Sequence, residues 1–185
     1  MSDNTFNNML VKHCSPVLAG IKTANMFTFF ETEEKVNNIV KGYNKALNSF
    51  GIYFYVLNNN EKSSLIYVYR LDKLKKDLQE KYVKTFMTKE GYDVYNPNLC
   101  IDRLSQKIKE KNGFPHEIGL FLSYPICDVL GFIKHKGNNF KYCGFWKVYG
   151  NETKAKQTFC KYEKCTNLYC KRFNKEKNLL KLIAN

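Results

Sequence analysis

Apolar residues recur at helical spacing in the middle and the last part of the chain. Between residues 33 and 49 they repeat every three or four positions and Gly51 closes the segment, which predicts an amphipathic helix. Residues 72–89, with breaks, and 98–111 show the same spacing and predict further helices. Asn151 is a preferred N-cap residue, so a long C-terminal helix is expected after it. Its apolar stripe comprises Ala155, Phe159, Tyr162, Thr166, Tyr169 and Phe173.

Aromatic and β-branched residues dominate several shorter segments, which predict strands. Two of these segments flank a polar loop at residues 58–62 and are expected to form an antiparallel hairpin. A short helix over residues 126–136 is expected between the last two strands. The five predicted strands cover residues 26–30, 52–57, 65–70, 117–122 and 140–149.

Near the N-terminus, Ser15-Pro16 predicts the start of a helix that ends at about Ala24. Serine is a good N-cap residue, and proline is favoured at the first helical position because its missing N–H would have no partner there. The resulting fold class is α+β, with a mixed sheet of about five strands packed with about six helices, including the long C-terminal one. We expect one domain over residues 1–185.

Composition places the chain among globular proteins. Hydrophobic residues make up 44% and charged residues 25% of the 185 residues. The polar N-terminus lacks a signal-peptide pattern, and no apolar stretch approaches the roughly 18 residues of a membrane span. The predicted location is the cytoplasm, with no membrane partner. Seven cysteines in a reducing compartment are expected to be free thiols.

Positive charge is concentrated in the last third of the chain. The formal net charge is +13, and residues 129–185 hold 13 Lys and Arg against three acids, or +10. Such a field favours anionic partners, either a small anionic molecule or, as the alternative, a nucleic acid. Residues 137–150 interleave lysines with aromatic residues, as nucleic-acid-binding strands do, although aromatic residues on a strand also serve as core.

His13-Cys14-Ser15-Pro16 is the segment with the most reactive potential. If Ser15 caps a helix, Cys14 lies where free backbone N–H groups stabilise a thiolate or a bound anion. His13 or His116 would then be the catalytic base, and Lys22 and Lys147 would contact the anion. The alternative is a buried cysteine beside a surface histidine.

Residues 114–125 are expected to run through a strand into a helix, so Ser123, Tyr124 and Asp128 would face a cleft. The alternative is a tight turn whose proline and glycine serve geometry alone. Cys160, Cys165 and Cys170 resemble a metal motif, but steps of five residues on one helix point the thiols in different directions, so no metal site is predicted. No cofactor fingerprint identifies a cofactor, and the pattern leaves open whether the protein is an enzyme.

Seven segments carry a resemblance to a known family, namely residues 13–16, 18–24, 114–125, 128–129, 131–133, 144–150 and 164–166. Together they resemble an uncharacterised bacterial family catalogued as domain of unknown function 3793. The resemblance implies a stand-alone cytoplasmic protein and carries no established activity.

Overall fold

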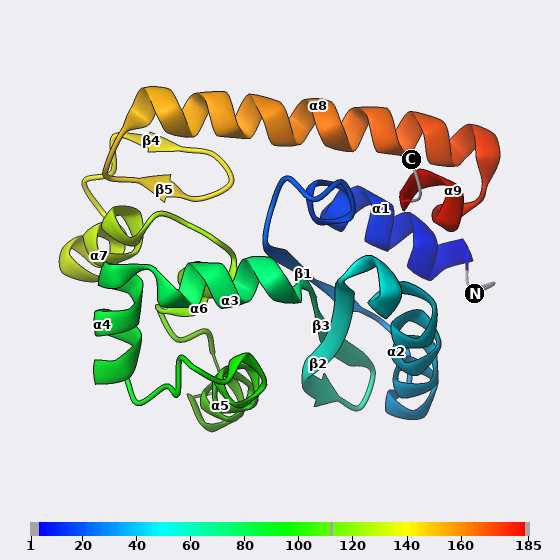
Figure 1. Ribbon diagram of the computed structural model, residues 1–185, viewed down its shortest axis with the longest axis horizontal. Coiled ribbons are helices and arrows are strands. Elements are labelled where there is room, and N and C mark those ends of the chain that lie inside the picture. Colours follow the sequence, from blue (N-terminus) through cyan, green and yellow to red (C-terminus); the bar gives the residue numbers. More distant parts are fainter. Residues whose placement is uncertain (1–3, 112, 184–185) are drawn as a thin grey trace.

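The computed structural model describes residues 4–111 and 113–183. Its first half contains a three-stranded sheet and two helices, α1 and α2, that pack on one face of this sheet (Figure 1). The elements of this half are α1 (Asn4–Leu18), β1 (Ala24–Phe29), α2 (Glu33–Leu47), the 3-10 turn η1 (Asn48–Phe50), β2 (Ile52–Asn60) and β3 (Ser63–Arg70).

The second half is largely helical, with one small hairpin. Its elements are α3 (Leu71–Gln79), α4 (Lys81–Lys89), α5 (Pro97–Lys111), α6 (Ile118–Phe121), α7 (Ile126–His135), β4 (Tyr142–Cys143), β5 (Lys147–Val148), α8 (Glu152–Glu176) and α9 (Leu179–Ile183).

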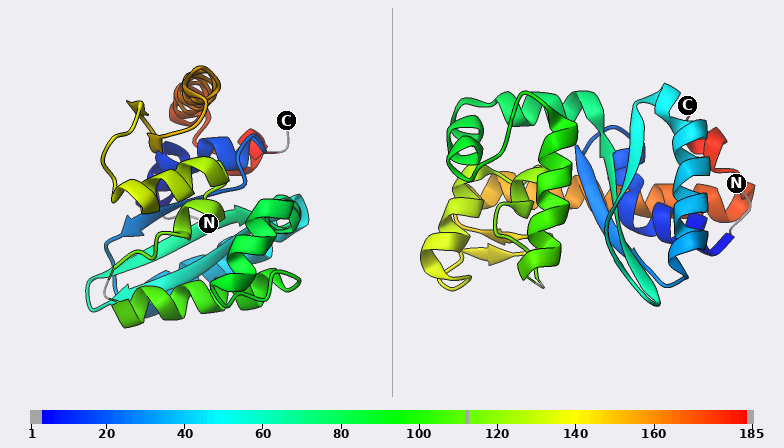
Figure 2. Two further views of the ribbon diagram at one scale, coloured as in Figure 1. Left: turned by 90° about the vertical axis from the view of Figure 1, so that its left-hand side faces the viewer. Right: turned by 90° about the horizontal axis from the view of Figure 1, so that it is seen from below.

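The main sheet has the order β1-β3-β2, and both ladders are antiparallel. Side chains alternate between the two faces of a strand, and helices cover both faces of this sheet. The central strand β3 is therefore buried on both faces. Ile66 and Val68 enter a core shared with α1 and α2, whereas Tyr67 and Tyr69 enter a core shared with α3, α5 and α6. Figure 2 shows the sheet between these two helical layers.

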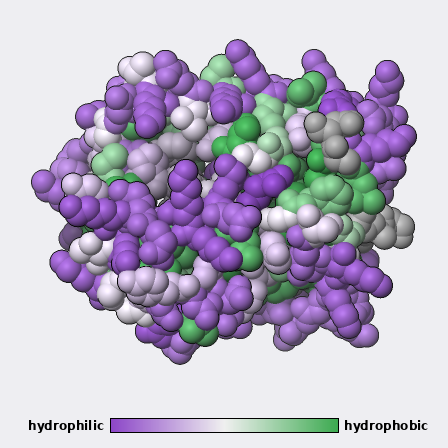
Figure 3. All heavy atoms as spheres, in the orientation of Figure 1, coloured by the Kyte–Doolittle hydropathy of each residue, from purple (hydrophilic) through white to green (hydrophobic). Residues whose placement is uncertain are grey.

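α8 extends along the whole molecule above the other elements (Figure 1). Its C-terminal half contacts α1, and Phe173 joins the core between α1 and the sheet. Its N-terminal half covers the β4–β5 hairpin, where Trp146, Val148 and Phe159 form a third, smaller core. The surface in this view is mostly hydrophilic, with hydrophobic side chains gathered over the region of α9 (Figure 3).

The structure confirms the α+β class and most of the predicted elements. The helix at residues 33–49, the hairpin, the helices between residues 72 and 111, the helix at 126–136 and the long C-terminal helix are all present. Asn151 caps α8, because its Oδ1 accepts a hydrogen bond of 2.9 Å from the Lys154 N–H. No helix in the described ranges is both long and apolar enough to cross a lipid bilayer.

The predicted single mixed sheet is wrong. Within the part of the chain that the structure describes, the strands form two separate sheets of three and two strands, and every ladder is antiparallel. Residues 117–122 hold the short helix α6 instead of a strand, and residues 140–149 fold back as the β4–β5 hairpin. Nine α-helices, not about six, occur in residues 4–111 and 113–183.

The first helix also begins twelve residues before Pro16, the predicted first helical position. α1 starts at Asn4, and Pro16 lies inside its last turn. A proline close to a C-terminal end is tolerated here because Phe6, Leu10 and Val17 anchor the helix in the core. Arg70 then binds the exposed carbonyls, with Nε 2.6 Å from the Val17 oxygen and Nη2 2.6 Å from the Leu18 oxygen.

Candidate functional site

Cys14 lies in the interior of the protein, not at a helix N-terminus. Its side chain is 0% exposed in the core between α1 and the sheet, and burial raises the pKa of the thiol to about 12 although the charge of Lys22 opposes this. Ser15 is equally buried, and its hydroxyl donates to the Val11 carbonyl within the same helix. The thiolate and the anion site predicted at this helix start are therefore wrong, because there are no free N–H groups beside Cys14.

The loop after α1 places Lys22 beneath the end of that helix. Gly20 adopts a left-handed conformation with φ +69°, which glycine takes without steric cost. The chain then turns back, so that the Lys22 N–H donates to the Pro16 carbonyl at 3.0 Å. β1 begins two residues later, at Ala24, and the Lys22 ammonium lies near the ring of Tyr162 in α8.

Lys22 is a buried cation with few polar partners. Its side chain is 4% exposed, and its one hydrogen bond within the described chain is to the Asn25 Oδ1 at 3.2 Å. The amide of Asn25 is held in this orientation because its Nδ2 donates to the His13 carbonyl. Two rings flank the ammonium, with centroids 5.5 Å away for Tyr124 and 5.7 Å away for Tyr162.

The electrostatic cost of this burial appears in the pKa of Lys22. Burial lowers that pKa to about 8 because the charged form loses its water, and the nearby Cys14 opposes the shift. No carboxylate in the described ranges forms an ion pair with the ammonium. At pH 7 the amine therefore remains mainly protonated. An ammonium has three N–H donors, so two remain for a ligand.

Lys22 opens into a groove of about 650 Å³. We call it the Lys22 groove. Its lining carries more positive than negative charge, with Lys12 and Lys22 opposed by Glu163. The lining residues are Lys12, His13, Pro16, Lys22, Asn25, Met26, Tyr124, Phe145, Tyr162, Glu163, Thr166, Asn167 and Cys170.

The imidazole ring of His13 also lines this groove. Its ring stacks on Phe27 with centroids 5.9 Å apart. Partial burial, together with the charge of Lys12, lowers the pKa of His13 from its ordinary value, so the neutral imidazole predominates at neutral pH.

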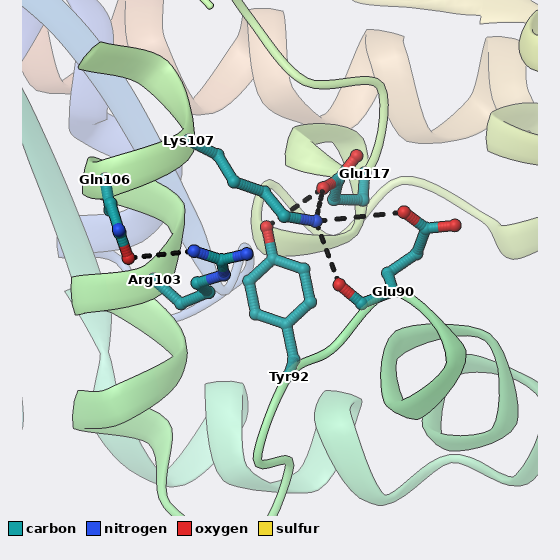
Figure 4. Close-up of polar contacts among 6 residues, drawn as sticks. All are labelled: Glu90, Tyr92, Arg103, Gln106, Lys107 and Glu117. Carbon is teal, nitrogen blue, oxygen red and sulfur yellow. Dashed lines mark hydrogen bonds and ion pairs between the residues drawn. The ribbon is translucent and has the colours of Figure 1, made fainter. Parts of the chain in front are cut away.

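A second buried lysine, Lys107 on α5, has a different environment (Figure 4). It is 7% exposed, and its Nζ lies 2.6 Å from the Glu117 Oε1 and 3.0 Å from the Glu90 carbonyl. Burial acts to raise the pKa of Glu117, but the bonds from Lys107 and Tyr92 outweigh it and hold that pKa below its ordinary value. Lys107 is a satisfied structural cation, and Lys22 is not.

The other predicted site residues gather in a separate cavity. His116, Tyr124, Asp128 and Lys147 all line a mainly apolar space of about 350 Å³, which we call the aromatic cavity. Its complete lining is Phe114, Pro115, His116, Ile118, Gly119, Tyr124, Asp128, Val129, Phe132, Trp146 and Lys147. Tyr124 also lines the Lys22 groove, so one ring separates the two spaces.

His116 is not positioned as the base for Cys14. Its side chain is exposed at the aromatic cavity, where its ring lies 5.5 Å from that of Phe132. Cys14 is sealed between α1 and the sheet. The structure therefore brings together His116 with Lys147 and His13 with Lys22. Lys22 is close enough to the Cys14 thiol to influence its pKa, but the thiol is buried in the core and lines neither space.

The groove residues that sequence reasoning missed include Lys12, Asn25 and Tyr162. Tyr162 was expected only as part of the buried stripe of α8, and it does lie in the third core. Asn25 adjoins the predicted first strand but shows no pattern of its own. The pairing of an N-terminal loop with α8, which lies some 140 residues later, is a tertiary contact that leaves no local signal.

The basic aromatic segment at residues 137–150 is only partly exposed. Trp146 is buried, whereas the side chains of Phe140, Tyr142 and Phe145 reach the surface. Two of the lysines bind backbone, since the Lys141 Nζ donates to Gly150 and the Lys147 Nζ donates to Gly137, each at 2.8 Å. Nucleic-acid binding by this segment stays a prediction.

Comparisons with known proteins add one positive finding. No curated protein matches the chain, and no solved structure matches it. A family described as "Protein of unknown function (DUF3793)" matches residues 10–183, a stretch that includes both the Lys22 groove and the aromatic cavity. The chain therefore belongs to the DUF3793 family of proteins of unknown function.

Proposed function

We propose that the protein binds a small anionic molecule in the Lys22 groove, with its negative charge against the Lys22 ammonium. The observation that carries this proposal is a lysine that is 4% exposed and forms no ion pair within the described chain. A buried charge without a partner costs several kcal/mol, and a bound anion would offset that cost.

The surroundings of Lys22 support an anionic ligand of modest size. Lys12 adds a second positive charge to the lining, and Thr166 and Asn167 add neutral hydrogen-bonding groups. The rings of Tyr124, Phe145 and Tyr162 provide apolar walls for the uncharged part of a ligand. A volume of about 650 Å³ is suited to a small metabolite.

A thermal unfolding series tests the proposal. Inorganic phosphate and malonate are added at constant ionic strength to the full chain, to Lys22→Met and to Lys161→Met. Lys161 is exposed on α8 and does not line the groove, so its replacement changes the net charge equally. We expect at least one anion to raise the melting temperature of the wild type and of Lys161→Met in a saturable manner but not that of Lys22→Met.

Two outcomes would contradict the proposal. One is that neither anion stabilises the wild type beyond the effect of chloride. The other is that Lys22→Met responds as the wild type does, which would place the anion elsewhere on the basic surface.

A further inference from the structure

The aromatic cavity is a second concave space, separate from the Lys22 groove. Five of its lining residues carry aromatic rings, namely Phe114, His116, Tyr124, Phe132 and Trp146. Its volume of about 350 Å³ is at the lower end of the range for small-molecule sites. The space therefore fits one compact ring system better than an extended chain.

The walls of this cavity are held in place by a buried carboxylate. Asp128 is 3% exposed and accepts three hydrogen bonds from N–H groups, one of 2.7 Å from the Trp146 Nε1 and two from the backbone of Tyr149 (2.8 Å) and Gly150 (2.7 Å). Trp146 in turn stacks on Tyr124, with ring centroids 4.8 Å apart. The cavity is thus preformed, and the negative charge of Asp128 on α7 is stabilised by N–H donors from residues 146–150.

Positive charge is available at the edge of the cavity. The Lys147 Nζ makes one hydrogen bond, to the Gly137 carbonyl, and lies 5.9 Å from the centroid of the Phe132 ring. Two of its three N–H donors have no acceptor within the described chain. His116 is exposed on the same cavity and adds a second polar group that can donate a hydrogen bond.

We propose that the aromatic cavity binds a small aromatic carboxylic acid, with its ring among the aromatic side chains and its carboxylate beside Lys147 and His116. Ring-on-ring contacts favour a planar aromatic group over an aliphatic one of equal size. The Lys147 ammonium favours an acid over a neutral alcohol of the same shape. This site is independent of the anion proposed for the Lys22 groove.

Trp146 is the single tryptophan of the chain and lines the cavity, so its fluorescence reports occupancy directly. The full chain is titrated with benzoate, cyclohexanecarboxylate and benzyl alcohol. We expect a saturable change in Trp146 emission with benzoate, and binding of the other two compounds at least several-fold weaker. No saturable change with benzoate, or an equal affinity for cyclohexanecarboxylate or benzyl alcohol, would overturn the proposal.

Variants locate the bound acid. Lys147→Met should weaken benzoate binding roughly tenfold, the size of one charge-assisted hydrogen bond. Lys141→Met is the matched control, because Lys141 lies on the same segment and also donates to a backbone carbonyl but does not line the cavity. It should bind benzoate like the wild type. If Lys22→Met loses the benzoate response and Lys147→Met keeps it, the acid lies in the Lys22 groove and the proposal is wrong.

A cavity-filling variant separates occupancy from surface binding. Ile118→Phe places a larger side chain at a half-buried lining position and should abolish the benzoate response while far-ultraviolet circular dichroism shows a folded protein. An unchanged benzoate affinity in this folded variant would also overturn the proposal.

Discussion

Lys22 and Lys107 are nearly equally buried, yet their surroundings differ in kind. Lys107 contacts the Glu117 carboxylate at 2.6 Å and the Glu90 carbonyl at 3.0 Å. Lys22 contacts one amide oxygen at 3.2 Å and the faces of two tyrosine rings. Burial alone therefore does not distinguish a structural lysine from a functional one. The presence or absence of a countercharge does, because only the unpaired cation leaves binding energy for a ligand.

The largest effect should follow from breaking the Lys107 pair. Lys107→Met leaves the Glu117 carboxylate buried without its cation, so we expect a loss of about 3–5 kcal/mol in the free energy of unfolding. Chemical denaturation measures this loss. Lys109→Met, at an exposed position of the same helix, is the control and should change stability by less than about 0.5 kcal/mol. A similarly small change for Lys107→Met would show that the pair is not structural.

The corresponding substitution at Lys22 should not lower the free energy of unfolding. Lys22→Met removes a desolvated charge, and we expect the free energy of unfolding at pH 7 to stay equal or to rise by up to about 3 kcal/mol, the equivalent of moving a pKa from 10.5 to about 8. A loss comparable to that of Lys107→Met would mean that the cation stabilises the fold.

The stability difference between Lys22→Met and the wild type should also depend on pH. Between about pH 8 and 10.5 the folded wild type has lost the Lys22 proton, whereas the unfolded chain still holds it. The stability of the wild type relative to the variant therefore rises through this window, and the advantage of the variant shrinks. The other groups near Lys22, among them Cys14, Tyr124 and Tyr162, occur in both proteins, so the difference isolates Lys22. A pH-independent difference would contradict the lowered pKa.

Asp128 is a third buried charged residue. It resembles Lys107 because its charge is stabilised by hydrogen bonds to other groups of the protein. Asp128→Asn replaces one carboxylate oxygen by an NH₂ group, which then faces an N–H donor. We expect a loss of about 1–3 kcal/mol and a red shift of Trp146 emission. Asp102→Asn serves as the control, since Asp102 is exposed and accepts one bond, from Tyr55, that an asparagine can keep. Equal stability of both variants would contradict the role of Asp128.

The smallest effect concerns the thiols. Cys127, Cys143 and Cys160 are exposed and should react first with a thiol reagent at neutral pH. Cys14 and Cys100 are buried and should react only after global unfolding. Mass spectrometry of the labelled peptides identifies the order. Early labelling of Cys14 would restore a reactive thiol beside Lys22.

Elements with a long periodic pattern were predictable from the sequence. The helical spacing in α2, α5 and α8 and the polar loop between β2 and β3 gave the correct element types. The short apolar run at residues 117–122 did not, because such a run fits a strand and a buried helix equally well. Ser15-Pro16 misled because a local cap signal was overridden by the upstream stripe of Phe6, Leu10 and Val11, which packs on the sheet.

The candidate sites were only half predictable. Lys22, Lys147, His116, Tyr124 and Asp128 were identified as residues of interest, and the structure groups four of them around the aromatic cavity and places Lys22 across Tyr124 from it. The sequence could not show which lysine would be buried without a neighbouring carboxylate, because that depends on how α8 covers the loop after α1. The sequence gives the charge of each side chain, but tertiary packing determines which groups that side chain contacts.

The most direct test of the central claim is the pKa of the Lys22 side chain, measured by heteronuclear NMR on lysine-labelled protein. The resonance is assigned from its absence in Lys22→Met. The account predicts a pKa near 8 in the free protein and a higher pKa when phosphate or malonate is bound, because the anion stabilises the ammonium. A pKa near 10.5 that responds to neither anion would contradict it.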